Sequence, residues 1–236
     1  MNKRKLHLFQ RVAIPLGFLC LFFLAARFTG CDLAAFWKRR SHLTDLVADM
    51  IPPDFSYIRK ILLPLFYTIQ MSVTGTVLGA FFAIAAAPFA AANLKFPAAP
   101  RRVLRILIQV LRSFPALILA LTATFLFGLG TFAGTFAITL YTFAIMTKLT
   151  YEDISAADPK PYLALCSMGV SRFQAYVHAV IPDIAPGFLT NALYLLEANM
   201  RHSSILGYVG AGGIGLLLNE KIPWLEFDKV GMILLI

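Results

Sequence analysis

Charged residues are scarce in this chain, and two long stretches contain none. Asp, Glu, Lys and Arg make up 14% of the 236 residues, whereas 59% are hydrophobic and the mean hydropathy is +0.75. No charged residue lies between Lys60 and Lys95, and none lies between Arg112 and Lys148. An ordinary soluble domain is about 45–50% apolar. The composition therefore excludes a soluble domain and predicts an integral membrane protein.

Motifs that bind nucleotides or carry out hydrolysis are also missing. The sequence has no G-x-x-x-x-G-K-[ST] loop for the phosphates of ATP, no H-E-x-x-H and no G-x-S-x-G. Its three cysteines, Cys20, Cys31 and Cys166, lie far apart without C-x-x-C spacing, so neither a metal site nor a disulfide framework is indicated. We expect no enzyme and no cofactor in this chain, and any ATP and Mg²⁺ would act in a partner.

Positive charge is in excess, with a formal net charge of +9. No basic run is interleaved with aromatic residues as a nucleic-acid groove requires, so we expect no nucleic-acid partner. Cytoplasmic loops rich in Lys and Arg explain the excess better. If the N-terminal Lys3-Arg4-Lys5 is cytoplasmic, the segments around Lys95, Arg101 and Cys166 are cytoplasmic too, and residues 29–63 lie outside.

The charge-free runs predict membrane helices, each of which needs about 20 apolar residues. The glycines at 128, 130 and 134 divide the second run into a hairpin. Val12–Phe28 has the pattern of a signal peptide, and we interpret it as a retained signal anchor, with cleavage as the alternative. We expect helices at Val12–Phe28, Leu65–Ala92, Val103–Phe127, Thr131–Thr147 and Ile184–Met200, and an incomplete one at Val230–Ile236.

That last segment has too few residues to cross a bilayer, which suggests either truncation of a longer sequence or a helix that stops against protein. The expected fold is therefore all-α, a polytopic transmembrane bundle of about six helices with the last one incomplete. We divide it into residues 1–63, a signal anchor with an extracytoplasmic segment, and residues 64–236, the transmembrane domain.

One segment looks like a helix of a soluble protein. Between Gly169 and Pro182, five apolar residues follow a helical period: Val170, Phe173, Val177, Val180 and Ile181. Pro182 is expected to end this helix. Amphipathicity alone leaves two readings open, an interfacial helix on the lipid headgroups or a docking helix for a cytoplasmic partner.

The sequence Gly210 to Gly215 satisfies G-x-G-x-x-G, a pattern of dinucleotide-binding folds. The soluble βαβ unit that the pattern requires is absent, because the segment follows a membrane helix. We instead predict a tightly packed turn at the mouth of a pathway, built on Gly210, Gly212, Gly213 and Gly215.

Ionisable residues inside membrane helices usually face a bundle interior or a water pathway. Arg105, Gln109 and Arg112 form one such polar stripe, and Glu197 and Arg201 form an i, i+4 pair. Snorkelling to the interfaces is an equal alternative for Arg105 and Arg201. Arg112 lies about two turns further in, and its guanidinium suits a phosphate-like oxyanion because it offers paired donors.

Several segments resemble ABC-importer permeases. Gly169-Val-Ser-Arg-Phe-Gln-Ala-Tyr with Ile181-Pro182 is similar to their cytoplasmic coupling loop, although Leu163-Ala164-Leu165 stands where the family has Glu-Ala-Ala. Further segments resemble the phosphonate-type permeases in particular: Ile51 to Ser56 with Thr68 to Met71 and Gly75-Thr76, Leu111 to Pro115, Phe127 to Gly134, and Leu206 to Gly215.

The resemblance implies a multi-pass permease of the bacterial inner membrane that imports a phosphonate or a related phosphorus oxyanion by alternating access. It also implies a homodimer with a cytoplasmic ABC ATPase and an extracytoplasmic binding protein. The coupling loop would span about 152–183, and coupling would rest on Gly169, Arg172, Phe173, Gln174 and Pro182. The substrate pathway would include Arg112, Glu197 and Arg201. A permease for another small substrate such as an amino acid, an ATPase-independent secondary transporter and a membrane-embedded enzyme are the alternatives.

Overall fold

Every regular element in residues 3–30, 37–94 and 97–236, the part of the chain that the computed structural model describes, is helical. Cys31 and Lys95 lie outside these residues. Two units form separate sets of contacts, residues 1–52 and residues 53–236. The all-α prediction is confirmed.

The first unit contains α1 (Lys3–Phe28) and α3 (Arg40–Asp49). The expected signal anchor falls within α1, whose large apolar side chains from Ile14 to Phe28 are exposed in the unit itself. Such a helix suits a lipid or protein environment, because in water this surface would be costly.

The expected boundary after residue 63 falls inside the first long helix of the second unit. The chain separates instead between Pro52 and Pro53. The reason is packing: Tyr57 and the fully buried Ile61 form a core cluster with Ile214, Met232 and Ile233 near the end of the chain. Residues 53–63 therefore belong to the transmembrane unit.

The second unit is a bundle of helices joined by short connections. Its elements are η1 (Phe55–Tyr57), α4 (Ile58–Ala90), α5 (Ala98–Ser113), α6 (Ala116–Phe127), α7 (Thr131–Ala156), α8 (Lys160–Ser167), α9 (Arg172–Ala175), η2 (Tyr176–Val180), α10 (Ile181–Leu206), η3 (Gly207–Val209), α11 (Ile214–Lys221) and α12 (Phe227–Leu235).

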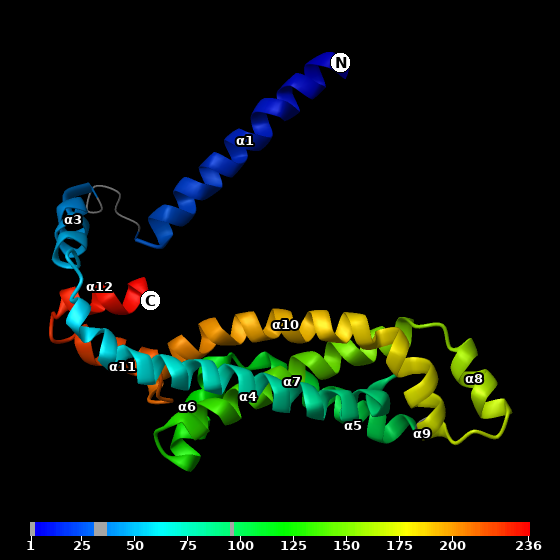
Figure 1. The fold of residues 1–236 in the computed structure, drawn as a ribbon. Coiled ribbons are helices and arrows are strands. Elements are labelled where there is room, and N and C mark those ends of the chain that lie inside the picture. The colour runs from blue at the N-terminus through cyan, green and yellow to red at the C-terminus, as the bar shows by residue number, and fades with distance from the viewer. Residues whose placement is uncertain (1–2, 31–36, 95–96) are drawn as a thin grey trace. The chain divides into compact units, whose positions relative to one another are not determined.

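The long helices α4, α7 and α10 lie side by side and form the centre of this bundle (Figure 1). Small residues on α4 let the backbone of α7 approach closely, as is common in membrane proteins. A β-carbon at Gly75 would lie 2.6 Å from Ile138, and one at Gly79 would lie 2.6 Å from Thr142. Larger side chains at these two glycines would push the helices apart.

One expected helix is broken. Val103–Phe127 consists of α5 and α6, which are bent by 94° at Phe114-Pro115. Phe114 has extended backbone angles, φ −87° and ψ 125°, because a residue before proline avoids the helical region. The prediction of a single helix here was wrong.

The prediction that Pro182 ends a helix was also wrong. The chain stays helical from Arg172 to Val209 through α9, a π turn (η2) and α10. Proline lacks the N–H that an α-helix needs, and the wider π turn directly before it is where the hydrogen-bond ladder is interrupted. The segment after Gly169 is thus the start of a membrane helix.

By length and composition, three helical stretches of the described chain are able to cross a membrane: Phe55–Ala90, Thr131–Ala156 and Arg172–Val209. The bent pair α5 and α6 makes up to one more. The apolar part of α1, Ala13–Phe28, is shorter, as is α12.

Candidate functional site

Gly169 forms the link between α8 and α9. Its φ is +87°, and it ends α8 with two hydrogen bonds typical of a Schellman motif. Its own N–H donates to the Cys166 carbonyl, and the Val170 N–H donates to the Leu165 carbonyl, each at 3.2 Å. A left-handed residue favours glycine, so the backbone itself explains why this position carries one.

Ser171 and Gln174 start the next helix. The Gln174 N–H donates to Ser171 Oγ at 3.3 Å, and the Ser171 hydroxyl donates to Gln174 Oε1 at 2.9 Å. This reciprocal pair resembles a capping box and fixes where α9 begins. Gln174, predicted as a coupling residue, therefore has at least a local structural role.

The apolar residues predicted for one face of this segment are divided between two faces. Val180 is buried, whereas Phe173 is 74% exposed and Val177 is 37% exposed. The face that packs inward carries Ala175 and Tyr176 together with Val180. Arg172 and Phe173 lie on the exposed side, where a partner can contact them.

The inward face packs into a core at the end of the long helices. Ala175, Tyr176 and Val180 share one cluster with Tyr151 and Ile154 of α7. The same cluster includes residues at the end of α4 and just after it: Ala87, Ala90, Ala91 and Leu94. A force on α9 therefore acts directly on the ends of α4 and α7.

Arg105, the first residue of the predicted stripe on α5, has local partners. Its Nε donates to the Ala90 carbonyl at 2.8 Å, and its guanidinium lies 4.9 Å from the centre of the Tyr151 ring. A cation that binds the last carbonyls of a helix is a stabilising C-terminal contact. Arg112 lies in the last turn of α5, just before the bend, and is exposed on the surface of the unit.

Glu197 and Arg201 form an ion pair on α10. Their oxygen and nitrogen are 2.9 Å apart, and the side chains are 63% and 69% exposed. Leu193 and Tyr194 are exposed beside them. Ionised groups that face lipid at membrane depth are expensive, so this surface suits a water-filled pathway or a second subunit better than lipid.

A buried polar network joins the three long helices. Asn199 of α10 is fully buried, and its Nδ2 donates to Thr76 Oγ1 of α4 and to Thr142 Oγ1 of α7, each at 2.8 Å. One turn further on, the hydroxyls of Ser203 and Ser72 are 2.8 Å apart. The sequence did not predict these residues as part of a site, because they carry no charge that would distinguish them within an apolar helix.

Three of the four predicted glycines lie in the compact loop between η3 and α11, and Gly215 lies in the first turn of α11. Gly210, Gly212 and Gly213 have φ angles of +83°, +81° and +76°, and a β-carbon at Gly215 would collide with the Ser204 carbonyl. The Gly210 carbonyl accepts a hydrogen bond from the Gly130 N–H at 2.9 Å. Two glycine loops that are 80 residues apart in sequence thus pack together.

This loop is tied to the polar network. The Ile214 N–H, the first of α11, donates to Thr68 Oγ1 at 2.9 Å, and the Thr68 carbonyl accepts from the Ser203 hydroxyl at 3.3 Å. The loop, α4 and α10 therefore share one set of hydrogen bonds.

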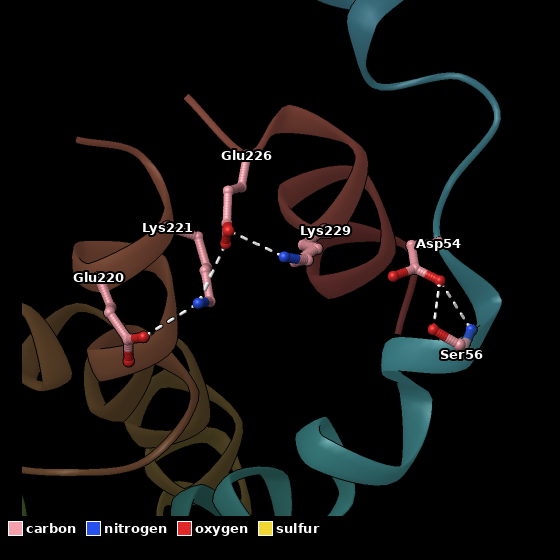
Figure 2. A network of polar contacts seen from close by, with 6 residues as sticks. All are labelled: Asp54, Ser56, Glu220, Lys221, Glu226 and Lys229. Atoms are coloured by element: carbon pink, nitrogen blue, oxygen red, sulfur yellow. Dashed lines mark hydrogen bonds and ion pairs between the residues drawn. The ribbon is translucent and has the colours of Figure 1, made fainter. Parts of the chain in front are cut away.

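A network of ion pairs fastens α11 to α12 (Figure 2). Lys221 Nζ lies 2.9 Å from Glu220 and 3.0 Å from Glu226, and Lys229 Nζ lies 2.9 Å from Glu226. Hydrogen bonds from Lys229 and Lys221 hold the pKa of Glu226 below its ordinary value, and the bond to Glu226 raises the pKa of Lys229.

The residue before η1 is hydrogen-bonded to the backbone of α12. The Asp54 N–H donates to the Asp228 carbonyl at 3.2 Å. The Asp54 carboxylate accepts from the Ser56 hydroxyl and N–H, which lowers its pKa. Among the described residues, no three His, Cys, Asp or Glu side chains gather as metal ligands would.

Comparison with known proteins identifies membrane components of transport systems. The family model described as "Binding-protein-dependent transport system inner membrane component" matches residues 75–235. The phosphite transport system permease protein PtxC of Stutzerimonas stutzeri is 34% identical over 194 residues, which cover 82% of this chain and 70% of PtxC. The phosphate-import permease protein PhnE of Mycolicibacterium smegmatis is 35% identical over 188 residues, which cover 79% of this chain and 35% of PhnE.

Among solved structures, the MetNI methionine ABC transporter in inward-facing conformations has a similar fold. The TM-score is 0.65 at 16% identity, over 77% of this chain and 90% of the MetNI chain. At this identity the likeness concerns the fold alone.

Proposed function

The chain belongs to the family of binding-protein-dependent transport system inner membrane components, and we propose that it carries a phosphonate or a related phosphorus oxyanion. It is a multi-pass permease of the inner membrane, a transport subunit and not an enzyme. The observation that carries the choice of substrate is the similarity to PtxC over most of the chain, since PtxC is named for phosphite transport.

The permease works with a cytoplasmic ABC ATPase and an extracytoplasmic binding protein, and two copies of it enclose the pathway. The Glu197–Arg201 ion pair supports a second copy, because it lies exposed on a helix long and apolar enough to cross the membrane. Placed between two copies, this surface faces a hydrated pathway instead of lipid. Arg112 and Arg201 then supply guanidinium groups, whose forked donors match the oxygens of a phosphorus oxyanion.

Transport follows alternating access. The ATPase pushes on Arg172 and Phe173, and the core that holds Tyr176 and Val180 passes the movement to α4 and α7. The segment that moves begins after Gly169, the link between α8 and α9, and continues through Pro182 into α10. Gly210, Gly212, Gly213 and Gly215 form the gate at the outer end.

Uptake by proteoliposomes that contain the permease, its ATPase and its binding protein tests the substrate. We expect ATP-driven uptake of phosphite or methylphosphonate, and none of L-methionine. Arg201→Gln should lower uptake about tenfold or more, because a hydrogen bond to a charged group contributes about 1.5–3 kcal/mol. The matched control is Arg102→Gln, an exposed arginine on α5. Uptake of methionine without uptake of any phosphorus oxyanion would refute the proposal.

Co-purification tests the coupling site. Phe173→Glu places a charge on the exposed apolar side chain and should abolish recovery of the ATPase subunit with the permease. Phe173→Leu keeps an apolar group and should retain it. Recovery of the ATPase with both variants would show that it docks elsewhere.

A further inference from the structure

Arg112 is an arginine without a partner in the bundle. It lies in the last turn of α5, its side chain is exposed, and it makes no hydrogen bond, ion pair or ring contact with any described residue. By contrast, Arg105 on the same helix donates to the Ala90 carbonyl, and Arg201 is paired with Glu197. An unpaired guanidinium inside a membrane protein faces water or a ligand, because facing lipid would be costly.

The helix that packs against α5 shows how deep this charge lies. That helix is α7, Thr131–Ala156, which is long and apolar enough to cross a membrane. The Arg112 guanidinium interacts electrostatically with the phenol of Tyr141, which lies ten residues after the start of α7 and fifteen before its end. Arg105, seven residues earlier on α5, contacts Tyr151 nearer the end of α7. The charge of Arg112 therefore lies near the middle of a helix able to cross the membrane.

Two tyrosine hydroxyls lie near this charge. The half-buried Tyr141 meets the His202 ring edge to face, with the ring centroids 5.1 Å apart, so packing restrains the Tyr141 side chain. Tyr194 of α10 interacts electrostatically with the same phenol and is 64% exposed. Neither hydroxyl has a hydrogen-bond partner among the described residues. The helices α5, α7 and α10 thus bring one unpaired guanidinium and two unpaired hydroxyls together.

We propose that Arg112, Tyr141 and Tyr194 together bind the oxygens of the transported anion midway along the pathway. This inference rests on the proposed function and adds the two tyrosines to it. A guanidinium offers a fork of two donors, and each phenol offers one more. Phosphite and phosphonates carry three oxygens on one phosphorus atom, so the fork and the phenols all find acceptors. A carboxylate has two oxygens, which the fork already engages, so the tyrosines favour a phosphorus oxyanion over an amino acid.

Thiol labelling of the full transporter tests the anion site without transport. Tyr194→Cys is made in a chain whose three native cysteines are replaced by serine, and the probes are the anionic sulfonatoethyl and the cationic trimethylammonioethyl methanethiosulfonates. The anionic reagent should react faster. Arg112→Gln should lower that preference about threefold or more, because a nearby unit charge attracts an anion even in water. Arg102→Gln, an exposed arginine ten residues earlier on α5, is the control and should leave the preference unchanged. The proposal is overturned if neither reagent reaches position 194, or if Arg112→Gln has no more effect than the control.

Uptake by proteoliposomes that contain the permease, its ATPase and its binding protein tests the two hydroxyls. Tyr141→Phe and Tyr194→Phe keep the rings and should each lower methylphosphonate uptake about tenfold, because each removes a hydrogen bond to a charged group. ATP hydrolysis stimulated by the loaded binding protein should stay near the wild-type rate, which shows that the complex assembles. Tyr67→Phe, at an exposed position of α4, is the control and should transport like the wild type. Unchanged uptake in both test variants would overturn the inference.

The two assays separate this inference from the proposed function. If the wild type imports phosphite or methylphosphonate, and neither Arg112→Gln nor the two phenylalanine variants lower uptake, only the inference fails. If the wild type imports no phosphorus oxyanion, but labelling at position 194 still prefers the anionic reagent through Arg112, the anion site stands and the proposed substrate fails.

Discussion

Replacing Asn199 with leucine removes the only side chain in the described bundle that donates hydrogen bonds to both α4 and α7. Both protons of its Nδ2 group are used, toward Thr76 and Thr142 at 2.8 Å. Its Oδ1 is buried and has no hydrogen-bond partner among the described residues. Leucine has a similar shape, so the substitution changes polarity more than volume.

The two effects of this substitution oppose each other. An interhelical hydrogen bond in a membrane protein contributes about 0.6 kcal/mol on average and about 1.7 at most. Two such bonds therefore contribute about 1–3 kcal/mol. A buried polar atom without a partner costs about 1–3 kcal/mol, and leucine removes that cost as well. We expect the stability of Asn199→Leu to lie within about 1–2 kcal/mol of the wild type, which makes the single variant uninformative.

A double-mutant cycle isolates the bond between α10 and α7. Unfolding of Asn199→Leu, Thr142→Val and the double variant in lipid bicelles should give a coupling energy of about 0.6–1.7 kcal/mol. Thr150→Val is the matched control, because Thr150 is buried on the same helix but donates to the Met146 carbonyl of its own turn. Its coupling to Asn199 should be within about 0.3–0.5 kcal/mol of zero. Equal coupling for both threonines would refute the assigned network.

Three further predictions concern packing, the coupling loop and pH. Gly79→Leu should destabilise the bundle by about 1–3 kcal/mol or more in an unfolding assay, because its β-carbon would lie 2.6 Å from Thr142 of α7. Gly187→Ala is the control. Its β-carbon would lie 3.7 Å from the nearest atom, so this variant should be neutral or stabilising in the same assay. Gly169→Ala should cost about 1–2 kcal/mol locally, because φ is +87°, and should speed hydrogen exchange of the adjoining amides without changing exchange in α12. The Glu226 network should loosen in acid: the folded pKa of Glu226 is lowered, so its stabilisation is present above the ordinary value of 4.5 and is lost as the pH falls through the folded value. The raised pKa of Lys229 has the opposite sign and matters only as the pH rises above its ordinary 10.5, so α12 exchange that changes near neutral pH would contradict the assignment.

The membrane helices were predictable where the absence of charged residues alone marks their extent. The run without charge from residue 61 to 94 contains most of α4, and the glycines at 128 and 130 mark the start of α7. The bend at Phe114-Pro115 was missed because an apolar run reveals length and not direction. The dipeptide itself carries the signal, since a residue before proline avoids helical angles.

The polar network was hidden for a different reason. Asn199 lies 123 residues from Thr76 and 57 from Thr142. Nothing local in the sequence shows that these three side chains meet, because the contact depends on how three helices cross. The glycine and threonine positions on α4 recur at helical spacing, which predicts a close-packed face but not its partner. The start of the predicted coupling segment was more accessible, since Gly169 has a local role that its residue type reveals, whereas the end predicted at Pro182 was wrong.

The helical stretch from Arg172 to Val209 carries or adjoins three parts of the candidate site. Its first turn carries the exposed Phe173, its middle carries Asn199, and the glycine loop follows its end, where the Ala211 N–H donates to the Leu206 carbonyl at 3.2 Å. Had Pro182 ended the helix, a push on α9 would have had to cross a loop. Instead the π turn Tyr176–Val180 is the one departure from α-helix between Arg172 and Leu206, and the core cluster with α4 and α7 holds that turn on its inner face. Helices kink at π turns and prolines. We therefore infer that movement applied at Phe173 would reach the glycine loop as long as that packing holds, and that loss of the packing would turn the movement into a local bend.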